Sequence, residues 1–221
     1  MIGQRNANRR KLAAWTLATL GMGMGHAAAE TATYDFADPK GVNGVMFVLD
    51  SELEPFVGIG GGISGQVTYD AEDPTSFSGA ISLDATTLQL VSGRMTDVMY
   101  GADWLNVEKR ATITVTFGEV TNVHAAHDHG EAEGHDHGDV LTVNGTLTFG
   151  PFSIDKQFNI DATVIEDGGT QRGAGEGDLL VLRSTFTVDR FDLGIENPGT
   201  DKVAQSITVM VPIAGYAVSG E

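Results

Sequence analysis

The chain contains no cysteine among its 221 residues, which excludes disulfides, thiolate metal ligands and lipid attachment through an N-terminal cysteine. Basic residues are also scarce: 13 lysines and arginines stand against 30 aspartates and glutamates, giving a net charge of −17. Such a surface repels nucleic acid and anionic lipid headgroups, and it attracts cations. We therefore expect no nucleic-acid partner.

Long hydrophobic runs are missing too. The most apolar stretch, Leu12 to Met24, is too short to span a bilayer comfortably. It follows four basic residues and precedes Ala27-Ala28-Ala29, which is the order of a signal peptide over residues 1–29. A membrane-spanning anchor is the alternative. Cleavage would leave residues 30–221 as one domain with nine basic and 30 acidic residues, a net charge of −21.

These features predict export. We expect a periplasmic protein that is not an integral membrane protein. The adjacent Arg9-Arg10 is compatible with twin-arginine export, although paired arginines also occur in ordinary export signals, so the route stays open.

Histidine is absent from residues 30–221 outside one short tract, and this absence limits the possible chemistry. Without a histidine on the scaffold there is no serine–histidine–acid triad, and without cysteine there is no thiol nucleophile. The chain also has neither an HExxH motif nor a phosphate-binding loop. We expect no enzymatic activity and no required cofactor.

The chain is rich in segments where apolar and polar residues alternate, which is typical of half-buried strands. The clearest segment runs from Asp139 to Glu166 and contains two strands joined by a tight turn at Gly150-Pro151. Residues 88–106 lose the alternation and place apolar residues at helical spacing. Gly60, Gly62 and Gly65 have the spacing of a dinucleotide-binding fingerprint, but a strand follows them, so we interpret them as a bend. Similar alternation recurs at residues 31–36, 45–54, 63–69, 77–86, 111–120, 179–188 and 206–218.

About eight such strands predict an all-β fold, either an antiparallel barrel or a two-sheet sandwich. The inward positions are almost free of polar groups, so a barrel could hold a hydrophobic chain. An ordinary packed core is the alternative explanation of the same apolar stripes. From alternation and aromatic bulk, the candidate ligand-binding residues are Phe47, Leu49, Val67, Tyr69, Ile81, Leu83, Met99, Trp104, Val115, Phe117, Leu147, Phe149, Phe158, Ile160 and Phe186.

The single histidine tract is a loop insertion, residues 124–138, between two predicted strands. Imidazole and carboxylate groups at this density predict binding of zinc, copper or nickel in solution. A solvated insertion without a metal-dependent role is the alternative, because short histidine-rich tracts bind metal by composition alone. The candidate metal ligands are His124, His127, His129, His135, His137, Asp128 and Asp136.

The order of segments resembles the YceI-like family of exported lipid-binding proteins. The matching elements are Gly65–Asp70 with Asp73-Pro74, Ser78–Asp84, the helical insert with Asp103-Trp104-Leu105, Ala111–Phe117, Val143–Gly150 and, most specifically, Arg190-Phe191-Asp192-Leu193-Gly194-Ile195. The resemblance covers nearly all of residues 30–221. It implies an eight-stranded lipocalin-like barrel that encloses a polyisoprenoid or similar amphiphilic chain, often as a homodimer, without enzymatic activity.

The chain departs from the family pattern at two places. Residues 95–100 stand where a histidine-bearing helix is usual, and Glu108-Lys109-Arg110 replaces a Tyr-Pro pair. The first hypothesis is thus a periplasmic carrier of a long-chain isoprenoid or amphiphilic lipid. The alternative is a periplasmic metal buffer or chaperone that uses the histidine tract, and a stress protein that acts through partner contacts is a third possibility.

Overall fold

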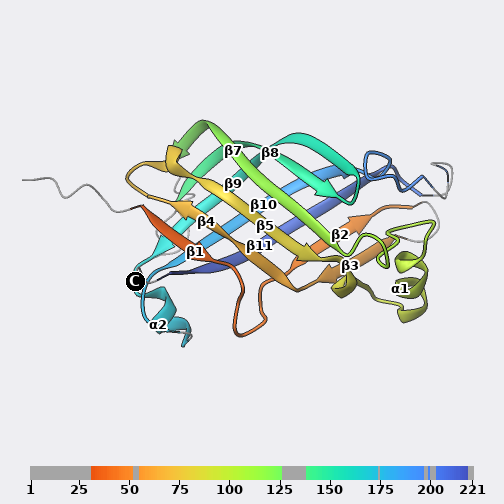
Figure 1. Cartoon of the computed structure of the whole chain (residues 1–221), viewed down its shortest axis with the longest axis horizontal. Coiled ribbons are helices and arrows are strands. Elements are labelled where there is room, and N and C mark those ends of the chain that lie inside the picture. Colours follow the sequence, from red (N-terminus) through yellow and green to blue (C-terminus); the bar gives the residue numbers. More distant parts are fainter. Residues whose placement is uncertain are drawn as a thin grey trace, which may run out of the picture.

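The computed structural model describes residues 31–51, 55–125, 138–173, 175–196, 199 and 203–218. These residues form an elongated, mostly β structure with one short helix near each end (Figure 1). Short 3-10 turns lie at Pro74–Ser76 and Ala85–Thr87. In chain order the other elements are β1 (Ala32–Asp35), β2 (Val45–Leu49), β3 (Phe56–Gly60), β4 (Ile63–Tyr69), β5 (Ser78–Asp84), β6 (Gln89–Leu90), α1 (Gly93–Tyr100), β7 (Thr112–Ala125), β8 (Asp139–Phe149), β9 (Phe152–Ile165), α2 (Gly168–Arg172), β10 (Leu179–Asp189) and β11 (Ser206–Ala217).

Eight antiparallel strands form a closed barrel in the order β1-β4-β5-β7-β8-β9-β10-β11. The barrel closes where β1 pairs with the end of β11, Tyr34 opposite Ala217 and Asp35 opposite Tyr216. The first half of β11 pairs instead with β2, which continues the sheet through β3 to β6. The structure therefore confirms the predicted all-β barrel with a short helical insert and decides against the sandwich.

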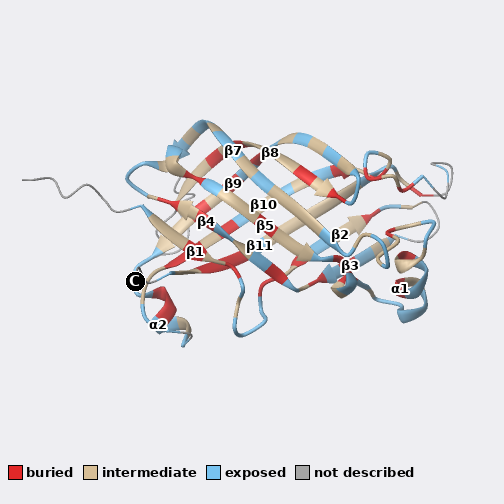
Figure 2. Cartoon of the chain, viewed as in Figure 1, coloured by how far each residue is buried: buried red, intermediate tan, exposed pale blue. Residues whose placement is uncertain are grey.

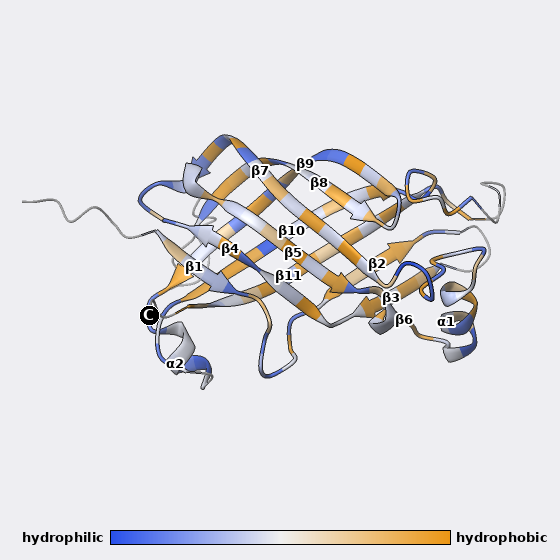
Figure 3. Ribbon diagram, viewed as in Figure 1, coloured by the Kyte–Doolittle hydropathy of each residue, from blue (hydrophilic) through white to orange (hydrophobic). Residues whose placement is uncertain are grey.

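Buried residues alternate with more exposed ones along the strands, and hydrophobic residues alternate with hydrophilic ones (Figures 2 and 3). This alternation turns the apolar side chains toward the inside of the barrel. In β8 the side chains of Leu141, Val143, Leu147 and Phe149 are buried, whereas Thr142 between them is partly exposed. The tight turn after Phe149 joins β8 to β9, as the sequence predicts. The same alternation gives the barrel an apolar inner face.

Strand β3 is an element that the sequence did not reveal, because glycines occupy its inward positions 58 and 60, and only Phe56 adds an apolar side chain on that face. A Cβ atom at Gly58 would lie 2.1 Å from a ring carbon of Phe47, and a Cβ atom at Gly60 would lie 2.6 Å from a methyl carbon of Leu88. Neighbouring side chains thus occupy the space that an apolar residue on β3 would need. The predicted glycine-rich bend is in part this strand, and only Gly61-Gly62 lies between β3 and β4.

The loop between β1 and β2 is fastened at the α2 end of the barrel by a buried carboxylate. The Asp38 side chain is 1% exposed, and its Oδ2 atom lies 2.8 Å from Nη2 of Arg172. Burial alone would raise the pKa of Asp38, but hydrogen bonds from the backbone N–H groups of Lys40, Val42 and Asn43 and the Arg172 guanidinium lower it below its ordinary value.

Asp38→Asn is therefore expected to lower the free energy of unfolding by about 2–3 kcal/mol at neutral pH. Because the pKa is depressed in the folded state, this stabilisation is complete above about pH 5 and is lost as the pH falls below about 4. Urea unfolding at several pH values measures both effects, with Asp192→Asn at an exposed position as the control. If the two variants had equal stability from neutral to acidic pH, the Asp38 contacts would carry no stabilisation.

Candidate ligand-binding cavity

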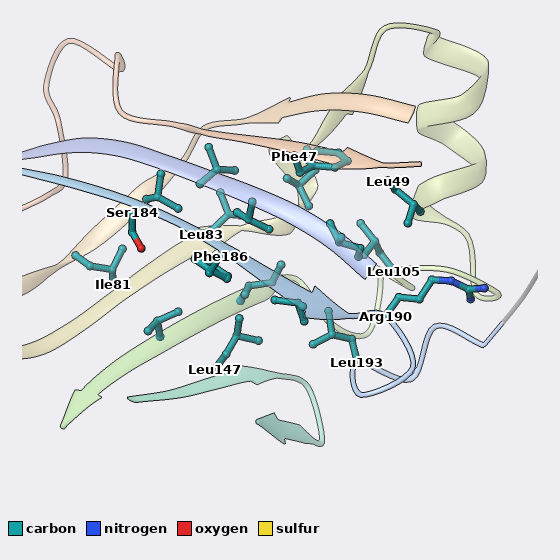
Figure 4. Close-up of a pocket in the computed structure, with 18 of the residues that line it drawn as sticks. Phe47, Leu49, Ile81, Leu83, Leu105, Leu147, Ser184, Phe186, Arg190 and Leu193 are labelled. Carbon is teal, nitrogen blue, oxygen red and sulfur yellow. The ribbon is translucent and has the colours of Figure 1, made fainter. Parts of the chain in front are cut away.

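A cavity of about 210 Å³ occupies the α1 end of the barrel. Its walls come from strands β2 to β11, and α1 with the loop behind it covers one end. Ile81 and Ser184 lie at one end of the cavity, and Leu105, Leu193 and Arg190 lie at the other (Figure 4). The volume exceeds that of the ~150 Å³ apolar cavities that stay dry and take up benzene or xenon. The barrel is thus partly hollow.

Most of the candidate ligand-binding residues line this cavity, although ligand contact itself stays a prediction. Three do not. Val67 and Tyr69 are buried in the packed part of the barrel, and Phe149 lies under the Arg110 guanidinium, 4.6 Å from its ring centroid. Alternation identifies the inward face of a strand but not the height at which the barrel becomes hollow, which is why it selected these three residues outside the cavity as well. The lining candidates are Phe47, Leu49, Ile81, Leu83, Met99, Trp104, Val115, Phe117, Leu147, Phe158, Ile160 and Phe186.

The structure also adds lining residues that the sequence analysis did not single out. Strand β11 contributes Ile207, Val209, Val211 and Ile213, and the alternation of this segment could have found them. Met95 and Val98 of α1 also line the cavity, and their helical spacing was a usable signal. Leu193 and Ile195 come from an irregular loop after β10, where no periodicity points to them.

The few polar side chains that line the cavity have partners elsewhere in the protein. Ser184 donates its hydroxyl to the backbone oxygen of Asn159 at 2.7 Å. Arg190 is fully buried, and it donates to the backbone oxygens of Ile195 at 2.6 Å and Ala204 at 3.0 Å. Its guanidinium also lies 4.4 Å from the Phe191 ring centroid. These contacts fasten the loop after β10, so the cavity presents hydrocarbon to a ligand.

Arg110 joins the two loops at the α1 end of the barrel. It donates from Nη2 to the backbone oxygen of Trp104 at 2.8 Å and from Nη1 to that of Leu193 at 2.9 Å. Its guanidinium stacks over Phe149 and Phe152, and burial lowers its pKa. Arg110 thus acts as a clamp that holds Trp104 and Leu193, both lining residues, in place.

Helix α1 forms the mouth of the cavity. The hydroxyl of Thr96 accepts a hydrogen bond from the backbone N–H of Leu90 at 2.9 Å, which ties α1 to the edge strand β6. The Tyr100 hydroxyl lies 2.7 Å from the backbone oxygen of Leu88. Val98 lines the cavity and is nevertheless 44% exposed. The interior therefore comes closest to solvent beside Val98.

The histidine tract lies mostly outside the described residues. His124 is exposed on β7, opposite Val140 of β8, and its Nε2 atom lies 2.8 Å from Nδ2 of Asn122. The other predicted metal ligands, at positions 127 to 137, fall in the range that the structure does not describe. Within the described ranges no three histidine, aspartate or glutamate residues form a group suited to a metal ion. Nor does any helix there have the length and hydropathy to cross a membrane.

The sequence and fold match known proteins. The YceI-like domain profile matches residues 43–214. The fold is similar to that of Burkholderia cenocepacia BcnA (15% identity, TM-score 0.57, covering 77% of this chain and 95% of that one). It is also similar to that of a Campylobacter jejuni YceI protein (12% identity, TM-score 0.57, covering 74% of this chain and 85% of that one). A third similar structure is a polyisoprenoid binding domain from Saccharophagus degradans (13% identity, TM-score 0.55, covering 86% of this chain and 100% of that one). The chain matches no curated protein at a significant level.

Proposed function

This chain belongs to the YceI-like family, and we propose that it is a carrier that holds the hydrocarbon chain of a polyisoprenoid or similar amphiphilic lipid inside its barrel. The cavity carries this proposal. A lumen of about 210 Å³ lined by hydrocarbon presents apolar surface that a ligand chain can cover, and covering it is favourable. The same strands fill the opposite end of the barrel with side chains, so a hollow is not an unavoidable result of this fold.

The lining determines which ligands fit. Burying a charged or hydrogen-bonding headgroup among these side chains would leave it without partners, because the polar groups of Ser184 and Arg190 already bond to the backbone. A hydrocarbon chain needs no such partners. The Saccharophagus degradans protein of similar fold is described as polyisoprenoid binding, which supports the same class of ligand for this chain.

Thermal unfolding of lipid-stripped protein tests the proposal. A ligand that binds only the folded state stabilises it by RT ln(1 + [L]/Kd), about 2.7 kcal/mol at a hundredfold excess over Kd. Adding a prenyl alcohol is expected to raise the melting temperature, whereas a polar alcohol without the chain is expected to leave it unchanged. Equal melting temperatures with both alcohols would count against a hydrocarbon-binding barrel.

We place this carrier in the periplasm. The basic and apolar segment within residues 1–29, outside the described residues, supports export. The −21 charge of residues 30–221 would keep the protein soluble there and away from anionic bilayer surfaces. The function is binding and transfer of a lipid, with no reaction assigned to the barrel.

Metal binding by the histidine tract is a second candidate function. Its support is the clustering of His124, His127, His129, His135 and His137, and the tract connects strands whose ends pair at Ala125 and Asp139. This pairing brings the two ends of the tract together before any ion binds, which reduces the entropy lost on closing the loop.

We expect zinc, copper or nickel to bind near neutral pH and to be released as the pH falls below about 6, because protonated imidazole cannot ligate. Calorimetry with zinc at neutral and acidic pH measures this, and deletion of residues 126–137 is the control. The deletion should remove the metal and leave lipid binding intact. Absence of heat with all three metals at neutral pH would end the metal hypothesis.

A further inference from the structure

The inside of the barrel is divided into a hollow part and a packed part. On several strands the inward-facing residues change from lining the cavity to full burial within two or four positions. In β10 Leu182 lines the cavity and Leu180 is 0% exposed, and in β8 the corresponding pair is Leu147 and Val143. The cavity therefore ends at a definite height in the barrel.

Two phenylalanines from outside the barrel strands, neither of which lines the cavity itself, fill the interior immediately beyond this height. Phe36 follows β1, is 0% exposed and donates its backbone N–H to the backbone oxygen of Gly65 at 2.9 Å. Its ring covers Gly215 of β11, where a Cβ atom would lie 2.6 Å from the ring. Gly215 is the next inward position after Ile213, which lines the cavity. Phe36 thus closes the β11 side of the lumen.

Phe77 closes the opposite side. It precedes β5 and is 1% exposed, and its ring centroid lies 5.1 Å from that of Phe117, a lining residue. The Tyr69 ring packs edge-on against the Phe77 ring, with 6.0 Å between the two ring centroids. From Phe117 the row of edge-on aromatic contacts continues into the cavity wall through Phe158 to Phe186. Such interlocked rings cannot move aside without opening a void in the packed end.

We propose that Phe36 and Phe77 form a stop that sets how long a hydrocarbon chain the barrel accepts. This inference rests on the proposed lipid-carrier function. The chain enters tail first beside Val98 at the α1 mouth, because the inward side chains that the structure describes at the packed end, such as Val67 and Leu180, are fully buried. Its terminal methyl group reaches the stop, and its headgroup remains at the mouth, since the polar groups in the cavity already have partners.

The stop predicts a plateau of affinity with chain length. Displacement of a hydrophobic fluorescent dye from the lipid-stripped full-length protein by 1-alkanols of increasing length measures it. Affinity is expected to rise by up to about fourfold per buried methylene until the chain meets the stop, and then to level off. Longer alkanols gain nothing, because their extra methylenes stay in water.

Substitutions near the stop should move the plateau in opposite directions. Ser184→Leu fills the deep end and is expected to shift the plateau to shorter alkanols. Val211→Phe acts on the same section, because Val211 pairs with Ser184 in the sheet, and it keeps the Ser184 hydrogen bond. Phe77→Leu shortens the stop and is expected to shift the plateau to longer alkanols. The matched control is Thr185→Leu, because Thr185 lies next to Ser184 on β10 but is exposed on the outer face. This variant is expected to leave the plateau length unchanged.

The possible outcomes distinguish failure of the stop from failure of the proposed lipid-carrier function. An identical plateau length in the wild type and in the folded Ser184→Leu, Val211→Phe and Phe77→Leu variants would overturn the stop, as would an affinity that keeps rising with length. Both results leave lipid binding in place. If no alkanol displaces the dye from the wild type, the carrier function fails and the stop fails with it.

Discussion

Val209→Trp is expected to weaken binding of a long-chain alcohol at least roughly 100-fold while the barrel stays folded. Val209 points into the cavity from β11, between Phe186 of β10 and Phe47 of β2 in the sheet register. An indole there takes the space of several ligand methylenes, each of which contributes about 0.8 kcal/mol when buried. Dye displacement measures the affinity, and circular dichroism checks the fold.

The matched control is Thr208→Trp. Thr208 is the neighbour of Val209 on the same strand, and alternation turns it to the outer face. The Thr208→Trp variant carries the same indole outside the cavity, so its affinity for the long-chain alcohol should equal that of the wild type. Equal affinity of both variants would show that the ligand does not occupy this part of the lumen.

Arg190→Met is expected to lower the free energy of unfolding by about 3–5 kcal/mol, the largest loss of stability that we predict for a single change. The substitution keeps an unbranched apolar side chain but leaves the buried backbone oxygens of Ile195, Val203 and Ala204 without their guanidinium partner. Ligand affinity should fall as well, because Leu193 and Ile195 in the freed loop line the cavity.

Arg183→Met provides the comparison for this measurement. Arg183 lies on the same strand with its side chain exposed, so its loss should change stability by no more than about 0.5 kcal/mol. Urea unfolding of the two variants tests the difference. A loss of less than about 1 kcal/mol for Arg190→Met would mean that other contacts already hold the loop after β10 in place.

Much of the barrel was predictable from the sequence because its strands follow a simple rule. The β8–β9 hairpin alternates apolar and polar residues along most of its length, with one interruption at the Gly145–Lys156 pair, and its register buries the apolar set. The spacing of four residues between Met95 and Met99 likewise indicated the helical insert. In both places local pattern and tertiary burial agree, so the sequence alone was sufficient.

The remaining features depend on contacts between distant segments. Gly58 and Gly60 occupy inward positions of β3 only because Phe47 and Leu88 fill the space, and no local pattern encodes this arrangement. Val67 has the same alternation as Ile81, yet one lies in the packed end and the other lines the cavity. Which part of a barrel is hollow depends on side chains such as Phe36 that arrive from outside the strands.

Native mass spectrometry of the protein, purified without detergent from its own host, tests the lipid-carrier account most directly. We predict a species heavier than the polypeptide by the mass of one lipid, which organic extraction releases as a molecule with a long hydrocarbon chain. A spectrum that contains only the bare polypeptide, with no lipid in the extract, would contradict the account.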